Sequence, residues 1–251
     1  MKKTGHNILF IGDIHGLSGW SELATEGLKH FYEIVFLGDY IDSFFVKPIE
    51  QLHNLKNLII FIKKNKTHVT ALLGNHDFAA INSYSGISGY QYEHAYEYRQ
   101  FFQDNLDLFQ IAWGYTNTDT NKYTLATHAG LTQTYWNKYI VYMFKEGEFL
   151  NKLTGKSPES ALEIPIHDTL NYLRDKKDIL WKVGSMRGGV GTPGPLWADY
   201  QELLDDPYAG INQIFGHTPL VSPRIDHIGD DFIACIDMYG NKKCSSMVIT
   251  L

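Results

Sequence analysis

The chain has 251 residues, a formal net charge of −6 and 44% hydrophobic residues. The hydrophobic content argues against disorder, and the negative charge argues against a broad nucleic-acid-binding surface. Its two cysteines, Cys235 and Cys244, cannot supply a four-thiolate zinc site, and we expect both to be reduced. The longest apolar run, Leu58 to Ile62, is far too short to cross a bilayer, and we expect a cytoplasmic protein.

The first half of the chain alternates short apolar runs with amphipathic stretches. The runs 8–11, 34–37 and 69–73 are short enough to be buried strands. Apolar residues spaced three or four apart predict a helix over 21–31, and a proline opens a second predicted helix over 48–65. Strands that alternate with helices in this way favour a largely parallel sheet.

The second half is less regular. The stretch 131–181 is rich in Tyr, Lys and Glu and predicts a helical insertion over or beside a site, with a helix start at Ser157-Pro158. Three short apolar runs near the end predict antiparallel strands at 211–215, 232–236 and 247–251. No linker or repeat divides the chain, so we expect one domain over 1–251.

Five short motifs carry the chemistry, and the first three each follow a predicted strand. A glycine at a strand end allows a sharp turn with positive φ and a close backbone approach, so the next side chains can converge. The motifs are Gly12-Asp13-Ile14-His15-Gly16, Gly38-Asp39-Tyr40-Ile41-Asp42, Gly74-Asn75-His76-Asp77, His128-Ala129-Gly130 and Gly216-His217-Thr218.

The residue types in these motifs suit phosphoester hydrolysis. A phosphoester resists attack because its oxygens are negative, and two metal ions about 3.5–4 Å apart neutralise that charge and supply hydroxide. Carboxylates bind hard divalent ions, whereas imidazoles favour transition metals. A mixture of Asp, His and Asn therefore favours manganese, iron or zinc over a pure magnesium site.

Read together and in order, the motifs resemble those of the calcineurin-like metallophosphoesterases. The likeness is greatest to the phosphoprotein phosphatase branch, with its bacterial, phage and Shewanella-like relatives, and it extends from Gly12 to Thr218. It implies an α/β fold, a four-layer αββα sandwich of two mixed sheets flanked by helices, with metals at the C-terminal strand edges. It also implies a phosphomonoesterase of the Ser/Thr protein phosphatase type with two divalent ions, most readily Mn, with Fe, Zn, Co or Ni as alternatives.

The resemblance also assigns roles residue by residue. His76 would be the general acid that protonates the leaving oxygen, and Asp42 would orient it. A hydroxide activated by both metals would attack phosphorus in line, without a covalent phospho-enzyme. The implied metal ligands are Asp13 and His15 for the first ion, Asp39 as the bridge, and Asn75, His128 and His217 for the second.

The chain departs from the family pattern after Asp42, where the relatives continue with Arg-Gly and use that arginine to grip phosphate. Here the chain continues Ser43-Phe44, so a main phosphate clamp is missing. Arg187 lies in a segment similar to one of the Shewanella-like branch, Met186-Arg187-Gly188-Gly189 followed by Gly194-Pro195-Leu196-Trp197. We expect Arg187 to replace the missing clamp together with Asn75, and Arg224 is the second choice. Asp77 stands where many relatives have Glu.

Several alternatives remain open from the sequence. A glycine-flanked Arg187 can be a solvated loop residue, and His76 with Asp42 can be a structural hydrogen bond. The substrate can be a phosphoprotein or a small phosphoester, with a hydrolase of dinucleoside polyphosphates or cyclic nucleotides as the first rival. A metal-binding interaction protein without turnover is a remote rival. We expect no membrane and no nucleic-acid partner.

An aromatic stretch and one further aspartate are also candidates for a binding role. The aromatic stretch 84–102 invites a base-stacking reading, but Tyr92, Tyr96 and Phe102 follow helical spacing, which favours packing. Asp237 lies just past a predicted strand, where it would be able to line a cleft.

Overall fold

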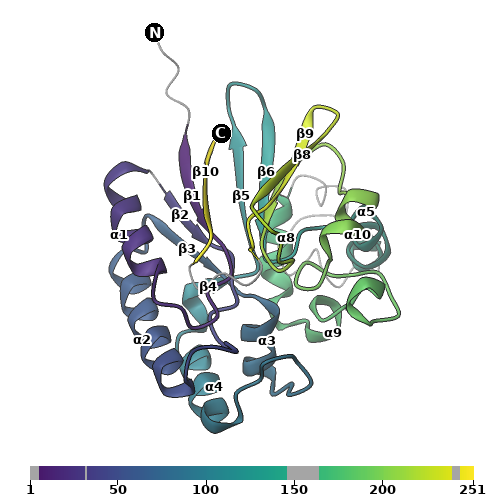
Figure 1. The fold of residues 1–251 in the computed structure, drawn as a ribbon. Helices are drawn as coiled ribbons and strands as arrows, with labels where there is room; N and C mark the ends of the chain where they lie inside the picture. Colours follow the sequence, from purple (N-terminus) through teal and green to yellow (C-terminus); the bar gives the residue numbers. More distant parts are fainter. Residues whose placement is uncertain (1–5, 32, 146–163, 239–243) are drawn as a thin grey trace.

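The computed structural model describes residues 6–31, 33–145, 164–238 and 244–251. Its centre is a pair of five-stranded sheets that lie against each other (Figure 1). The first sheet has the strand order β10-β1-β2-β3-β4 and the second has the order β5-β6-β7-β9-β8. No helix within these described ranges is long and apolar enough to span a membrane.

The first sheet contains the three strands predicted in the first half of the chain. Strands β1 to β4 are parallel to one another, and β10 pairs with β1 in the antiparallel direction. Their bounds are β1 Asn7–Ile11, β2 Glu33–Phe36, β3 Val69–Leu72, β4 Phe109–Gln110 and β10 Ser246–Thr250.

The second sheet corrects part of the prediction for the last strands. Strands β7 and β9 were expected to be antiparallel, but they pair in parallel. The reason is that β8 lies between them in the sequence and pairs antiparallel to β9 at the sheet edge. Because β8 is mostly exposed, it lacks an apolar run and was not predicted. The bounds are β5 Ala112–Asn117, β6 Lys122–Thr127, β7 Asn212–Phe215, β8 Arg224–Ile228 and β9 Asp231–Cys235.

The side-chain alternation along β1 shows how the layers pack. Ile8 and Phe10 point into the core between the two sheets, whereas Leu9 and Ile11 belong to the core beneath the helices. On the far side of the second sheet, Phe215 packs with Leu203 in a third cluster. Helices therefore cover both outer faces, and the predicted four-layer α/β sandwich is confirmed.

Helices α1, α2 and α4 lie outside the first sheet, and α5 and α10 lie on the opposite side of the molecule (Figure 1). The predicted helices over 21–31 and 48–65 are confirmed as α1 and α2. The bounds are α1 Trp20–His30, α2 Pro48–Lys64, α3 Asn75–Asn82, α4 Ala95–Asp104, α5 Gln133–Tyr135, α6 Val141–Lys145, α8 Ile166–Tyr172, α9 Lys177–Leu180 and α10 Tyr200–Asp205.

The described residues of the stretch 131–181 include α5, α6, α8 and α9, and the helical insertion over 131–181 stays a prediction. The helix start expected at Ser157-Pro158 lies outside the described residues, and the single domain over 1–251 stays a prediction. The prediction that Tyr92 and Tyr96 pack in the interior is wrong, because Tyr92 is 76% exposed and Tyr96 is 71% exposed. Tyr98 and Phe102 form the buried face of α4 instead.

Candidate metal centre

The first three motifs follow β1, β2 and β3 at one edge of the first sheet, as expected. Gly38 has the predicted positive φ, at 108°. The prediction is wrong for Gly12 and Gly74, where close packing is the reason for glycine. A Cβ on Gly74 would lie 2.0 Å from Asp39 Oδ1, and one on Gly12 would lie 2.4 Å from Ser245 Oγ. The glycines therefore let neighbouring chain segments approach each other.

Four residues of the predicted site that are not glycine also have a positive backbone φ. The angles are 41° at His15, 51° at Asp39, 65° at Asp42 and 62° at His217. Residues with a Cβ rarely adopt this region, and such strain gathers at functional sites. The surrounding hydrogen bonds must therefore hold these four residues in place.

Asp77 supplies such bonds around Asp39. Its carboxylate accepts the backbone N–H groups of Asp39 at 2.8 Å, of Tyr40 at 2.9 Å and of Gly74 at 2.9 Å. The turn after β2 and the turn after β3 are thereby tied to one side chain. Burial raises the pKa of Asp77 to about 7, and the nearby charge of Asp39 acts in the same direction.

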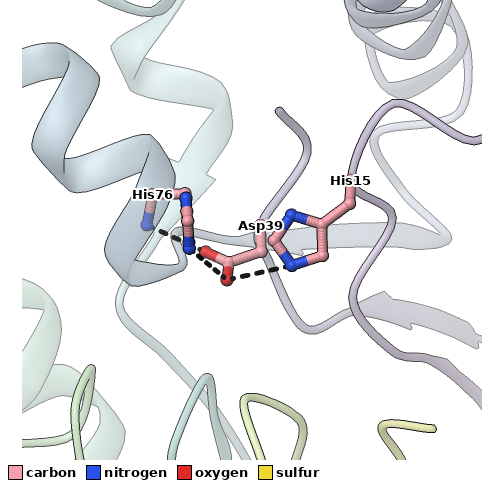
Figure 2. A group of neighbouring side chains, drawn as sticks. All are labelled: His15, Asp39 and His76. Carbon is pink, nitrogen blue, oxygen red and sulfur yellow. Dashed lines mark hydrogen bonds and ion pairs between the residues drawn. The ribbon is translucent and has the colours of Figure 1, made fainter. Parts of the chain in front are cut away.

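Asp39 lies at the centre of the predicted ligands. Its Oδ2 lies 3.7 Å from His15 Nε2 and 3.4 Å from His128 Nε2. It also lies 3.9 Å from Nε2 of His76, and Figure 2 shows Asp39 between His15 and His76. A carboxylate in this place faces nitrogen donors on two sides, which is the arrangement that a bridging ligand needs.

Two histidines are oriented by backbone carbonyls. Nδ1 of His15 donates to Ile41 O at 2.8 Å, and Nδ1 of His128 donates to Leu37 O at 2.8 Å. Nε2 of each ring is thereby turned toward Asp39 and would supply its lone pair to a bound metal ion. A hydrogen bond from the other ring nitrogen is the usual support of a metal-binding histidine.

The remaining predicted ligands join on either side. On one side, Asp13 Oδ2 lies 3.9 Å from Nε2 of His15. On the other, Asn75 Oδ1 lies 2.9 Å from His128 Nε2 and 3.1 Å from His217 Nδ1. The structure thus brings all six predicted ligands together, in two sets that share Asp39.

The site holds strongly perturbed groups. Burial raises the pKa of Asp39, but His128 and the other histidines outweigh it and hold this pKa well below its usual range. Burial lowers the pKa of His128, but Asp39 and Asp13 raise it to about 10. Burial raises the pKa of Asp13 well above its usual value, and burial with His128 and Arg187 lowers that of His217.

These residues fit a pair of divalent metal ions. The donor set combines carboxylates, an amide oxygen and imidazoles, which suits transition metals such as manganese, iron or zinc. Nε2 of His217 is buried and has no hydrogen-bond partner in the described part of the chain. Crowded acceptors and uncompensated buried groups are what cations relieve.

His76 and Asp42 form a second, adjacent unit. Nδ1 of His76 lies 3.0 Å from Asp42 Oδ2, and both side chains are buried. The backbone N–H of His76 also donates to Asp39 Oδ1 at 2.9 Å. Burial lowers the pKa of His76, but Asp39 and Asp42 raise it above the usual value.

A cavity of about 710 Å³ opens over these groups. Five of the six predicted ligands line it, and His128 lies fully buried beneath. His76, Arg187 and Asp237 also line the cavity, whereas Arg224 does not and pairs with Asp226 on the surface. Arg187 is held by Asp199 at 3.0 Å and donates to Thr218 Oγ1 at 3.0 Å.

The sequence matches a known family over most of its length. The model of the calcineurin-like phosphoesterases matches residues 6–242, nearly the whole chain. The chain belongs to the calcineurin-like phosphoesterase family. This calcineurin-like phosphoesterase is therefore a metal-dependent phosphoester hydrolase, with His and Asp groups that are able to hold metal. A comparison with curated proteins finds no match.

Solved structures share the fold at low sequence identity. A cold-active protein-tyrosine phosphatase of a psychrophilic Shewanella species is 15% identical, with a TM-score of 0.52, and the match covers 98% of this chain and 75% of that one. A further structure titled as a cold-active protein tyrosine phosphatase is also 15% identical, with a TM-score of 0.53, and covers 98% and 74%. At this identity, the likeness concerns the fold alone.

Sequence reasoning missed several residues of the calcineurin-like phosphoesterase site. Asp77 was noted only as a departure from Glu, although its bonds tie two turns together. Asp199, which pairs with Arg187, lies outside the five motifs, and no sequence pattern marks it as part of the site. Phe44 was noted only in the pair Ser43-Phe44 that stands where relatives have Arg-Gly, and Phe45 was not considered, yet both line the cavity.

Proposed function

We propose that this calcineurin-like phosphoesterase is a phosphomonoesterase of the protein phosphatase type that uses two metal ions. The observation that carries the proposal is Asp39 among His15, His128 and His76 at 3.4–3.9 Å, with the other predicted ligands around them. Two bound divalent ions would neutralise the phosphate and supply hydroxide. Asp13, His15 and Asp39 would hold one ion, and Asp39 would share the other with Asn75, His128 and His217.

The residues of the chain would then divide the remaining work. His76 would give its proton to the leaving oxygen as the bond to phosphorus breaks, so the products are an alcohol and inorganic phosphate. Asp39 and Asp42 support this role because their carboxylates raise the pKa of His76, and Asp42 also fixes the orientation of the imidazole. Arg187 and Asn75 would bind the phosphate, since both line the cavity.

The substrate and the native metal belong to this proposal. The resemblance favours phosphorylated Ser or Thr and manganese, and the Shewanella structure is titled a protein-tyrosine phosphatase. The cytoplasmic location stays a prediction from the sequence.

One screen tests the proposal. Manganese-loaded protein would be assayed on nitrophenyl phosphate, phosphoserine and phosphotyrosine peptides, a dinucleoside tetraphosphate and a cyclic nucleotide, with and without chelator. We expect chelator-sensitive release of phosphate from the monoesters. Turnover of the tetraphosphate or cyclic nucleotide alone would favour the nucleotide hydrolase, and no turnover with metal bound would favour the interaction protein.

A further inference from the structure

Two neighbouring phenylalanines stand at the mouth of the cavity. Phe44 and Phe45 are each 72% exposed, and both line the cavity that holds the metal-ligand residues. Neither ring stacks on another ring within the described part of the chain, and most of each side chain is open to a ligand. Large apolar side chains that gather at the surface beside a cavity usually mark a binding site.

The loop that carries these rings is held in place by hydrogen bonds. Ser43 Oγ accepts the backbone N–H groups of Phe45 and Val46, both at 3.2 Å. Gln51 accepts the N–H of Ser43 at 3.0 Å and donates to Val46 O at 2.7 Å. Ser43 therefore closes the turn that presents Phe44 and Phe45. A fixed loop loses little conformational entropy when a ligand binds.

The rings lie on the side of the proposed proton donor. The loop begins directly after Asp42, which contacts His76. The segment around Gly89 packs beside this loop, because a Cβ on Gly89 would lie 3.2 Å from Phe44 Cζ. Gln91 joins the two segments through its bonds to Asp42 Oδ1 and Ser43 O. A leaving group protonated by His76 would meet this aromatic rim.

The charged residues that line the cavity limit the charge that this leaving group is able to have. Arg187 is the one Lys or Arg among the described residues that line the cavity. Asp13, Asp39 and Asp237 line it as well, and the whole chain is negative. One phosphate would occupy Arg187 and the metals, so a second anionic group would find no partner. This argues against dinucleoside polyphosphates and for an uncharged leaving group.

We propose that Phe44 and Phe45 form a subsite for an aromatic leaving group, so that the preferred substrates are aryl phosphate monoesters, including a phosphorylated tyrosine side chain. This inference rests on the proposed function. Free aromatic faces favour an aromatic ring because ring pairs gain energy beyond the area they bury. Phe44 and Phe45 would therefore set the selectivity for the leaving group, and the metal centre would bind the phosphate.

The experiment compares phenyl phosphate with propyl phosphate in the manganese-loaded enzyme. Phe44→Ala and Phe45→Ala should each lower kcat/KM for phenyl phosphate by about two- to tenfold more than for propyl phosphate. Comparing this ratio between variants removes the intrinsic difference between the two leaving groups. Ile60→Ala is the matched control, since Ile60 is an exposed apolar residue of α2 that does not line the cavity.

Binding without turnover gives an independent readout. Phenylphosphonate should inhibit wild type more strongly than propylphosphonate, and the preference should shrink in both alanine variants. Phe44→Leu should keep only part of it, because leucine is apolar but has no ring. Equal changes for the aryl and propyl compounds would overturn the subsite while leaving the phosphatase intact. Absence of chelator-sensitive turnover on either ester would instead contradict the proposed function, and the inference with it.

Discussion

His76 and Asp42 are joined by a 3.0 Å contact between Nδ1 and Oδ2, and the other oxygen of Asp42 accepts the backbone N–H of Gln91 at 3.1 Å. The carboxylate is thus fixed from two sides, and the imidazole has one orientation. Its Nε2 then faces Asp39 Oδ2 at 3.9 Å, at the edge of the metal site. This geometry separates a residue that moves a proton from residues that hold metal.

The first prediction tests that separation. His76→Asn should lower kcat by about two to four orders of magnitude on an alkyl phosphate, the range expected of a general acid. The loss should be smaller on nitrophenyl phosphate, whose leaving group hardly needs a proton. Steady-state kinetics and metal analysis check both points, and His30→Asn on the exposed face of α1 is the control. Equal losses on the two substrates would show that His76 is not the acid.

The second prediction concerns the bridging carboxylate. Asp39→Asn should remove most of the bound metal after reconstitution with manganese, because one charge that serves two ions is lost. Elemental analysis of the dialysed protein measures this, and we expect up to two ions per chain in wild type. Asp104→Asn on α4 is the control, since Asp104 accepts a hydrogen bond from the exposed Gln100, far from the cavity lining. Retention of two ions by Asp39→Asn would rule out the bridge.

The third prediction is proton release on metal binding. The pKa of His128 is raised to about 10 without metal, so below that pH its imidazole carries a proton that a metal must displace. Affinity should therefore rise with pH and level off near pH 10, with His128 contributing about one released proton. Calorimetry in two buffers of different ionisation enthalpy at pH 8 counts the protons. His128→Gln should release about one fewer, and an unchanged count would contradict the prediction.

The fourth prediction concerns phosphate binding by Arg187. A charge-assisted bond is worth about 1.5–3 kcal/mol, so Arg187→Ala should lower kcat/KM about tenfold to a hundredfold and weaken phosphate inhibition in parallel. Arg187→Lys should rescue only in part, because lysine lacks the planar fork. Arg224→Ala is the matched control, since Arg224 pairs with Asp226 outside the cavity. If Arg187→Ala changes neither quantity, the metals and Asn75 hold the phosphate without Arg187.

The fifth prediction concerns the fold around the site. Asp77→Ala would leave the buried N–H groups of Asp39, Tyr40 and Gly74 without their acceptor. Each unsatisfied group costs about 1–3 kcal/mol, so the free energy of unfolding should fall by about 3 kcal/mol or more. Denaturant unfolding of the metal-free protein measures it, with Asp104→Ala as control. A fall in the free energy of unfolding of less than about 1 kcal/mol would mean that the two turns keep their structure without Asp77.

The sequence by itself determined three parallel strands of the first sheet, two of the helices that cover it and the grouping of the metal ligands that follow these strands. The apolar runs before Gly12, Gly38 and Gly74 predict strands, and parallel strands end at one sheet edge, so Asp13, Asp39 and Asn75 have to meet there. His128 and His217 came from motifs alone. These features are local in the chain, which is why patterns of a few residues reveal them.

The tertiary structure decided what depends on contacts between distant segments. β8 has no apolar run because it lies exposed at a sheet edge, so the direction of β7 against β9 was missed. No local pattern predicts that Arg187 pairs with Asp199, or that Asp77 ties the turn after β3 to the turn after β2. Likewise, Phe44 and Phe45 became a cavity rim only when the turn closed by Ser43 placed them beside the metal ligands. Hydrogen bonds and packing across the sheet, rather than local propensity, fix these positions.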